Sequence, residues 1–280
     1  GFTDSLPDDV LSATVRLHGS QARLLAFALP PSLPSESLTS LTFSQTIELL
    51  PASSSWSLEE LALPSDLHLL LASLRSGSVR AVSDGSFKDK FGASAFAIVA
   101  STTCSIIGMN VVPGHPDDQS ACRSELAGLF AIVLLVNLLC SWDGITSGGI
   151  EVGCDGLSAL SKAFDTWPLE PADPHFDMLS ALRSMISSSP LTWTTRHVAG
   201  HQDDDSTQTL DWWALQNIQM DNLAKVFWMQ HSHSEPVFYP LSNEGFQVWL
   251  GTRKLSSHSP SVFFDHVHGK TVLNWHSSHH

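Results

Sequence analysis

The stretch from Val79 to Val112, VRAVSDGSFKDKFGASAFAIVASTTCSIIGMNVV, decides the fold class. It contains three apolar runs of strand length, Val79 to Ser83, Gly92 to Ala100 and Cys104 to Val112. A short polar segment separates the first two runs, and a Ser-Thr-Thr turn separates the last two. Connections this short join neighbouring strands that run antiparallel, so the three runs predict an antiparallel meander.

Downstream of this stretch, helical and strand patterns alternate. The pattern predicts a long helix at about 121–140, a strand at 149–154, and two helices, one from 157 onward and one at 174–187. A further strand at 191–198, a polar loop at 200–209 and a last helix at about 210–229 follow. The order βββαβαβα predicts an α/β domain over residues 80–231, in which a mixed five-stranded sheet is flanked by helices.

The two flanks carry no chemical motif. Residues 1–79 are rich in Ser, Pro and Leu and are interpreted as a connector or the end of a preceding domain, with a strand at 22–29 and helical turns near 57–63 and 66–74. Residues 232–280 form a C-terminal extension of unknown fold, with a candidate strand at 262–264. Because the chain starts at Gly1, we expect it to be a piece of a longer protein.

Composition restricts the classes of function. The net charge is -14, with 14 Lys and Arg against 28 Asp and Glu, which argues against a freestanding nucleic-acid binder. The four cysteines lack metal-binding spacing and indicate reduced core thiols, so we expect an intracellular protein, cytoplasmic or nuclear without distinction. The longest apolar run, Leu126 to Cys140, fits a buried helix better than a membrane span, and no membrane partner is expected.

Four acidic residues occupy places from which a site can be built. Asp84 and Asp155 each end a predicted strand just before a glycine, Glu125 lies in the early turns of the long helix, and Asp221 lies inside the last helix. Each alone has an ordinary explanation, as a turn residue, a helix-dipole partner or a solvated side chain. Together they could hold two Mg²⁺ or Mn²⁺ ions about 3.5–4 Å apart, the arrangement that supports in-line phosphoryl displacement.

Five blocks, SDGSF, SELAGL, GCDG, VAGHQDDD and MDNLAK, occur in this order and coincide with the predicted elements. They resemble the ribonuclease H family, and the style of the last two is similar to the ribonuclease H domains attached to reverse transcriptases of eukaryotic retroelements. The resemblance covers residues 80–231. It implies a ribonuclease H-like sheet and an endonuclease that hydrolyses the RNA strand of RNA–DNA hybrids with two Mg²⁺ ions, Mn²⁺ being an alternative.

The resemblance also implies a role for each acidic residue. Asp84 would bridge both metals, Glu125 and Asp155 would complete the shell of the first, and Asp221 would bind the second. His201 resembles the mobile family histidine that assists leaving-group protonation or product release.

Other residues near these blocks have weaker assignments. His197 competes with His201, but its place in a strand indicates a structural role. Ser86 and Asn222 are candidate polar contacts to the substrate. The run Asp203 to Asp205 is interpreted as a solvated loop, and Trp212 and Trp213 are interpreted as core or partner-facing residues. The sequence lacks the basic, Trp-rich helical insertion with which some family members grip the hybrid.

Two alternatives to the nuclease remain open. One is a non-catalytic scaffold module of a polyprotein. The presence of all four carboxylates argues against it. The other is a transposase or integrase of similar fold, which Asp221-Asn222 fits poorly. The acidic charge further predicts that an upstream reverse transcriptase domain delivers the hybrid, unless a basic strip of Lys88, Lys90 and Arg123 is sufficient.

Overall fold

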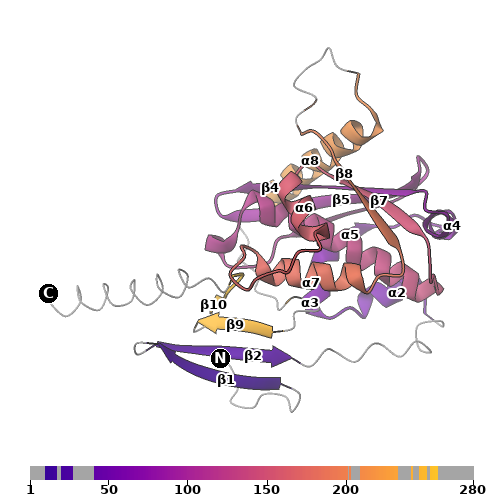
Figure 1. Cartoon of the computed structure of the whole chain (residues 1–280). Coiled ribbons are helices and arrows are strands. Elements are labelled where there is room, and N and C mark those ends of the chain that lie inside the picture. The colour runs from indigo at the N-terminus through magenta and orange to yellow at the C-terminus, as the bar shows by residue number, and fades with distance from the viewer. Residues whose placement is uncertain are drawn as a thin grey trace.

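The fold comes from a computed structural model of the whole chain (Figure 1). The structure describes residues 10–17, 20–27, 41–200, 202, 209–232, 241, 246–250 and 253–257. The predicted strand at 262–264 and most of the loop that contains His201 lie outside these residues.

The centre of the molecule is a mixed sheet of six strands in the order β3-β6-β5-β4-β7-β8. The predicted meander is β4 (Val79–Lys88), β5 (Phe91–Ser101) and β6 (Cys104–Val111), which pair antiparallel. β7 (Gly149–Cys154) and β8 (Thr192–His197) add in parallel beyond β4, each after a helical crossover. The α/β fold class and the mixed sheet are therefore confirmed.

The register between β4 and β7 fixes where the two strand aspartates lie. Their parallel pairing ends with Ser83 opposite Cys154, so the next residues, Asp84 and Asp155, leave the ladder side by side. One detail of the prediction is corrected here, because Asp84 does not end its strand. β4 continues to Lys88 through its pairing with β5, and only its pairing with β7 stops before Asp84.

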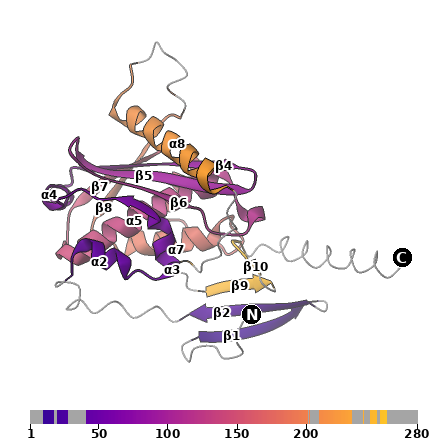
Figure 2. The same ribbon diagram turned by 180° about the vertical axis from the view of Figure 1, so that it is seen from behind.

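Helices cover both faces of the sheet (Figures 1 and 2). α5 (Ala121–Asp143) lies on one face with α6 (Leu157–Phe164) and α7 (Phe176–Ser187), and α8 (Trp212–His231) lies on the other. α5 is apolar and long enough to cross a membrane by composition, but 78% of its most apolar window is buried inside the protein. That burial is expected of the central core helix in this fold.

Residues 41–79, which the sequence left in the connector, pack into this core. The segment forms α2 (Phe43–Glu48), α3 (Ala52–Ser55), η1 (Trp56–Leu58), β3 (Glu60–Ala62) and α4 (His68–Ser76). Trp56 contacts the ring of Phe130 on α5, and Leu70 and Leu74 are fully buried. Of the helical turns expected at 57–63, only the start is helical, in η1, because the rest of the stretch forms a sixth strand, β3, paired with β6.

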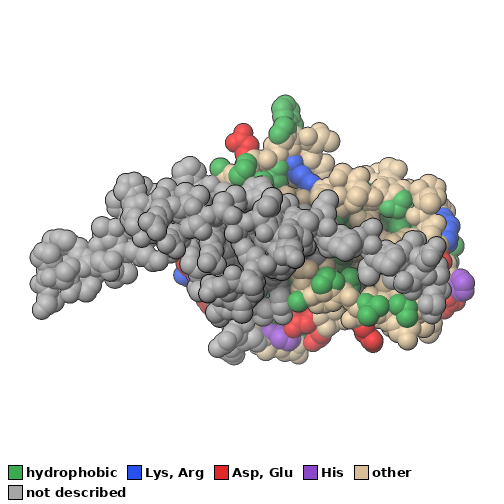
Figure 3. All heavy atoms as spheres, turned by 90° about the horizontal axis from the view of Figure 1, so that it is seen from below, with side chains coloured by type: hydrophobic (Ala, Val, Ile, Leu, Met, Phe, Trp, Pro, Cys, Tyr) green, Lys and Arg blue, Asp and Glu red, His purple; other side chains and the backbone are tan. Residues whose placement is uncertain are grey.

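A second, smaller sheet has the order β1-β2-β9-β10. It joins β1 (Val10–Leu17) and β2 (Ser20–Phe27) from the N-terminal flank to β9 (Phe246–Leu250) and β10 (Arg253–Lys254) from the C-terminal extension. It lies below the helices α5 and α7 in Figure 1. Seen from below, the described surface mixes apolar and acidic side chains with small areas of Lys and Arg (Figure 3).

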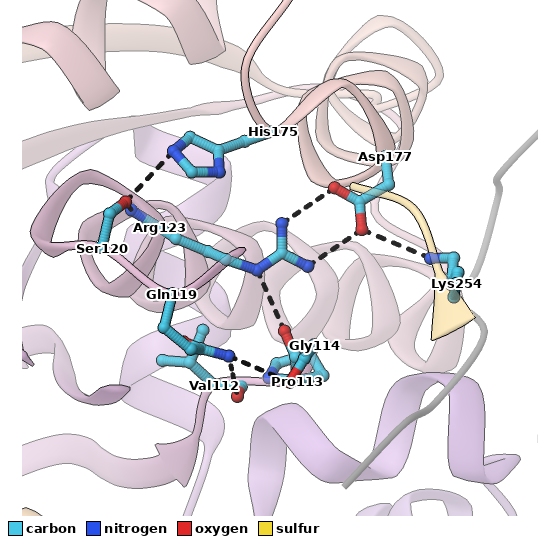
Figure 4. A network of polar contacts seen from close by, with 9 residues as sticks. All are labelled: Val112, Pro113, Gly114, Gln119, Ser120, Arg123, His175, Asp177 and Lys254. Carbon is cyan, nitrogen blue, oxygen red and sulfur yellow. Dashed lines mark hydrogen bonds and ion pairs between the residues drawn. The ribbon is translucent and has the colours of Figure 1, made fainter. Parts of the chain in front are cut away.

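Buried ion pairs attach β10 to the main domain (Figure 4). Arg123 of α5 donates to both carboxylate oxygens of Asp177 on α7, at 2.8 and 2.9 Å, and Lys254 reaches the same carboxylate at 3.3 Å. All three side chains are buried, and the pKa of Asp177 is held well below its usual range by Arg123 and Lys254 despite the burial. This network is chiefly structural, and it removes Arg123 from the basic strip considered above.

Candidate functional site

The structure brings the four predicted carboxylates together. Asp84, Glu125, Asp155 and Asp221 line one cavity of about 310 Å³, and its wall also contains Gly85, Ser86, Phe87, Ala121, Asn217, Ile218 and Lys225. The strand register supplies Asp84 and Asp155, α5 supplies Glu125, and α8 supplies Asp221 from the opposite face of the sheet. Rigid elements therefore position all four side chains.

The glycines after the two strand aspartates have a packing role. A Cβ on Gly85 would lie 2.7 Å from the backbone nitrogen of Glu125, and a Cβ on Gly156 would lie 2.6 Å from its Cγ. A side chain at position 85 would push the backbone of α5 away from the sheet, and one at position 156 would displace the side chain of Glu125. The Asp-Gly pairs therefore let the helix bring Glu125 against the strand ends, which is a different function from the turn that such pairs ordinarily indicate.

Glu125 is held at both of its carboxylate oxygens. The backbone N–H of Gly85 donates to Oε1 at 3.1 Å, and the thiol of Cys154 donates to Oε2 at 3.2 Å. The side chain is 7% exposed, and burial, followed by the negative charges of Asp84 and Asp155, raises its pKa well above the usual range. The carboxylate is therefore oriented, and the negative charge around it favours a cation as its ligand.

Asp84 is the electrostatic centre of the cluster. It is 4% exposed, and desolvation by burial, with the nearby charges of Asp155 and Asp221, raises its pKa from 3.8 to about 8. Asn217, one helical turn before Asp221 on α8, donates from Nδ2 to Asp84 Oδ2 at 3.1 Å. Asp84 thus interacts with carboxylates contributed by both faces of the sheet.

The other two carboxylates are less buried. Asp155 and Asp221 are both of intermediate exposure. Gly200, the residue before His201, approaches Asp155 so closely that a Cβ there would lie 2.8 Å from Oδ2. Lys225 contacts Asp221 Oδ2 at 2.6 Å along the same helix.

The donor set fits hard divalent cations. The oxygens come from clustered carboxylates, in which burial and neighbouring negative charge raise the pKa values of Asp84 and Glu125, and a cation that neutralises the cluster relieves this repulsion. Asn217 adds an amide oxygen, Oδ1, that is buried without a hydrogen-bond partner in the described part of the chain. The ligand atoms of Glu125, Cys154 and Asp155 lie within 4.8 Å of one another, close enough to share one ion.

The remaining predicted residues lie as follows. Ser86 lines the cavity, whereas Asn222 is absent from its lining and donates its amide to the carbonyl of Ile218 at 2.9 Å. His197 contacts the backbone carbonyl of Asp155 at 3.1 Å, as a structural residue would. His201 and the run 203–205 lie outside the described residues.

The aromatic and basic side chains near the site are also engaged. Trp213 is 6% exposed and packs over Gly153, while Trp212 is partly buried. Lys90 pairs with Asp117 at 2.7 Å, and Lys88 lies over a tryptophan ring of α8. With Arg123 buried, the basic strip that the sequence suggested is not assembled.

Sequence reasoning missed three residues of the site, Asn217, Cys154 and Lys225. Asn217 and Lys225 stand four residues before and after Asp221, so helical spacing alone could have placed both on its face. Cys154 precedes Asp155, but strand alternation assigns a neighbouring side chain to the opposite face. Only the position of α5 shows that Glu125 reaches this thiol.

Neither a protein-family model nor a curated protein matches the sequence. Among solved structures, the chain is similar to ribonuclease H1 of the halophilic archaeon Halobacterium salinarum, with 14% identity, a TM-score of 0.35, and coverage of 53% of this chain and 98% of that one. It is also similar to the protease-reverse transcriptase of prototype foamy virus, with 17% identity, a TM-score of 0.35, and coverage of 53% and 20%. These likenesses concern the fold alone. The assignment of the fold rests instead on the strand order of the central sheet and on the helical crossovers before β7 and β8.

Proposed function

We propose that this chain is a metal-dependent endonuclease that hydrolyses the RNA strand of RNA–DNA hybrids, as part of a larger reverse transcriptase polyprotein. The observation that carries the proposal is the cavity in which Asp84, Glu125, Asp155 and Asp221 converge. The ordered sequence blocks that resemble ribonuclease H contribute every one of these residues.

The proposed division of roles follows the electrostatics. Asp84 interacts with both Asp155 and Asp221, so it would be shared between two Mg²⁺ or Mn²⁺ ions. Glu125 and Asp155 would help to hold one ion, and Asp221 would help to hold the other. The ions would supply charge stabilisation for an in-line displacement at phosphorus.

Other groups of the protein orient the carboxylates and would select the substrate. Gly85, Cys154 and Asn217 fix the two most buried carboxylates before any ligand enters. Ser86, on the cavity wall, is the candidate contact to a ribose 2′-hydroxyl, the group that distinguishes RNA from DNA. His201 is assigned to leaving-group protonation or product release, from the sequence resemblance and from the position of Gly200 beside Asp155.

A non-catalytic scaffold is the alternative of a different class. The repulsion among the buried carboxylates argues against a scaffold, because it destabilises the fold and a protein without catalytic activity gains nothing from it.

A cleavage assay with a hybrid labelled on its RNA strand tests the proposal. The wild-type chain should cleave it with Mg²⁺ or Mn²⁺, Asp84→Asn should not, and an all-DNA duplex of the same sequence should remain intact. Absence of cleavage under both ions, at protein concentrations that saturate the hybrid, would favour the scaffold.

We also propose that a neighbouring reverse transcriptase domain delivers the hybrid. The chain carries a net charge of -14; of the three basic residues considered, Arg123 is buried in an ion pair, Lys90 pairs with Asp117, and Lys88 lies over a tryptophan ring. Phosphate contacts dominate nucleic-acid affinity, so the isolated chain should bind weakly. Titration with labelled hybrid in Ca²⁺ measures this: submicromolar affinity at physiological salt would refute delivery, and rescue by the upstream domain would support it.

A further inference from the structure

Cys154 is a buried thiol in direct contact with the site. It is the last residue of β7, its side chain is 0% exposed, and its Sγ lies 3.2 Å from Glu125 Oε2. The thiol donates in this contact, because a carboxylate oxygen accepts and an S–H group can donate.

The contact completes a three-sided restraint on Glu125. The N–H of Gly85 holds Oε1, the backbone of Gly156 packs against Cγ, and the thiol of Cys154 holds Oε2. The carboxyl group of Asp84 also interacts with Glu125, but as a member of the same acidic cluster. Because two of these restraints are backbone groups, Cys154 is the member that substitution can remove without moving the main chain.

A thiol is suited to this position because it is a weak donor. A carboxylate oxygen has two acceptor directions, and a single weak S–H contact leaves the other direction of Oε2 open to a cation. An apolar side chain at this position would remove the donor that orients Oε2.

We propose that Cys154 is a positioning residue whose thiol holds Oε2 of Glu125 in the orientation that receives a divalent cation. The inference rests on the proposed function, because the orientation matters only if the cavity binds metal. The competing explanation is that Cys154 merely fills the core, as a small buried hydrophobic residue does.

Cys140 provides the matched control for that explanation. It is also a buried thiol, 2% exposed, and it lies near the C-terminal end of α5, far along the same helix from Glu125. Substituting it removes a similar volume from the core without touching the cluster. Any effect of core volume alone should therefore appear equally in Cys140→Ala and Cys154→Ala.

The experiment titrates the full chain with Mn²⁺, following free ion by electron paramagnetic resonance, and records the infrared S–H stretching band. Cys154→Ala should weaken Mn²⁺ binding about tenfold, the usual effect of losing a partner of a metal ligand. Cys154→Ser, which keeps a donor, should stay within about threefold of wild type, and Cys140→Ala should not change it. The wild-type minus Cys154→Ala spectrum should show a hydrogen-bonded S–H band that shifts when Mn²⁺ is added.

The outcomes separate this proposal from the proposed function. If the wild-type chain binds no Mn²⁺, both are overturned. If it binds Mn²⁺ with an affinity that Cys154→Ala leaves unchanged, or if the S–H band is that of a free thiol, only the role of Cys154 is overturned. Should Cys154→Ala fail to fold, the Cys154→Ser titration and the wild-type band still decide.

Discussion

Replacing Asp84 with Asn should make the metal-free protein more stable while destroying its proposed activity. The pKa of Asp84 is raised from 3.8 to about 8 by burial and by the charges of Asp155 and Asp221. The folded protein therefore holds this proton more tightly than the unfolded chain. The stabilisation is complete below about pH 4 and is lost as the pH rises towards 8.

The size of the effect follows from the shift. At 1.36 kcal/mol per pKa unit, the wild-type free energy of unfolding should fall by about 4 kcal/mol between about pH 5 and pH 8 through this group alone. The amide in Asp84→Asn carries no charge to desolvate, so its slope should be much shallower. A residual slope will remain because the pKa of Glu125 is also raised.

Urea unfolding in chelator, at several pH values, measures both slopes. Groups that titrate elsewhere, such as His175, whose pKa burial lowers to about 4, are common to both proteins and cancel in the difference. Glu48→Gln, which removes an exposed carboxylate on α2, is the control and should follow the wild type. Parallel wild-type and Asp84→Asn slopes would refute the assignment of a strained, buried charge. Saturating Mg²⁺ should stabilise the wild type and not the variant.

Three further outcomes are expected. His201→Ala should slow hybrid cleavage by about 100-fold or less and leave Mn²⁺ affinity unchanged, which single-turnover rates and a metal titration would establish; equal loss of both would mean that the histidine acts on the metal site. Asn217→Ala should weaken Mn²⁺ binding about tenfold, whereas Asn222→Ala, on the same helix but outside the cavity, should not. Lys254→Met should lower the free energy of unfolding by only about 1–2 kcal/mol, because the Arg123 pair remains, whereas Arg123→Met should cost about 3–5 kcal/mol, both read from urea unfolding.

The sheet could be predicted because most of its strands are recognisable from their own local sequence. The runs from Val79 to Val112 have the length and spacing of a meander, and the later elements alternate in a way that only a crossover sheet satisfies. Residues 41–79 could not be placed, because β3 has only three residues and is stabilised by distant contacts. Its neighbour η1 is also fixed by a distant contact, the hydrogen bond from buried Asn110 to the carbonyl of Ser57.

The carboxylate positions followed from the sequence, whereas their environment did not. Strand order places Asp84 beside Asp155, and helix position places Glu125 and Asp221 near them. The hydrogen-bond and ion-pair partners of these side chains depend on how distant elements pack. Asn217 reaches Asp84 from α8, on the opposite face of the sheet from α5, and Arg123 is buried in an ion pair with Asp177. Side-chain direction on a helix that is buried nearly all round cannot be read from periodicity, since the apolar pattern there marks no single face.

The energetics of the site explain why an acidic chain can serve a polyanionic substrate. Burial, followed by the charges of neighbouring carboxylates, raises the pKa values of Asp84 and Glu125, so these groups destabilise an otherwise well-packed core. A divalent cation would relieve that repulsion, and its binding free energy would add to folding stability. The same negative charge that recruits cations repels phosphate until the cations are bound. On the proposed function, metal loading before substrate entry and a neighbouring surface that brings the hybrid would both follow from this charge distribution.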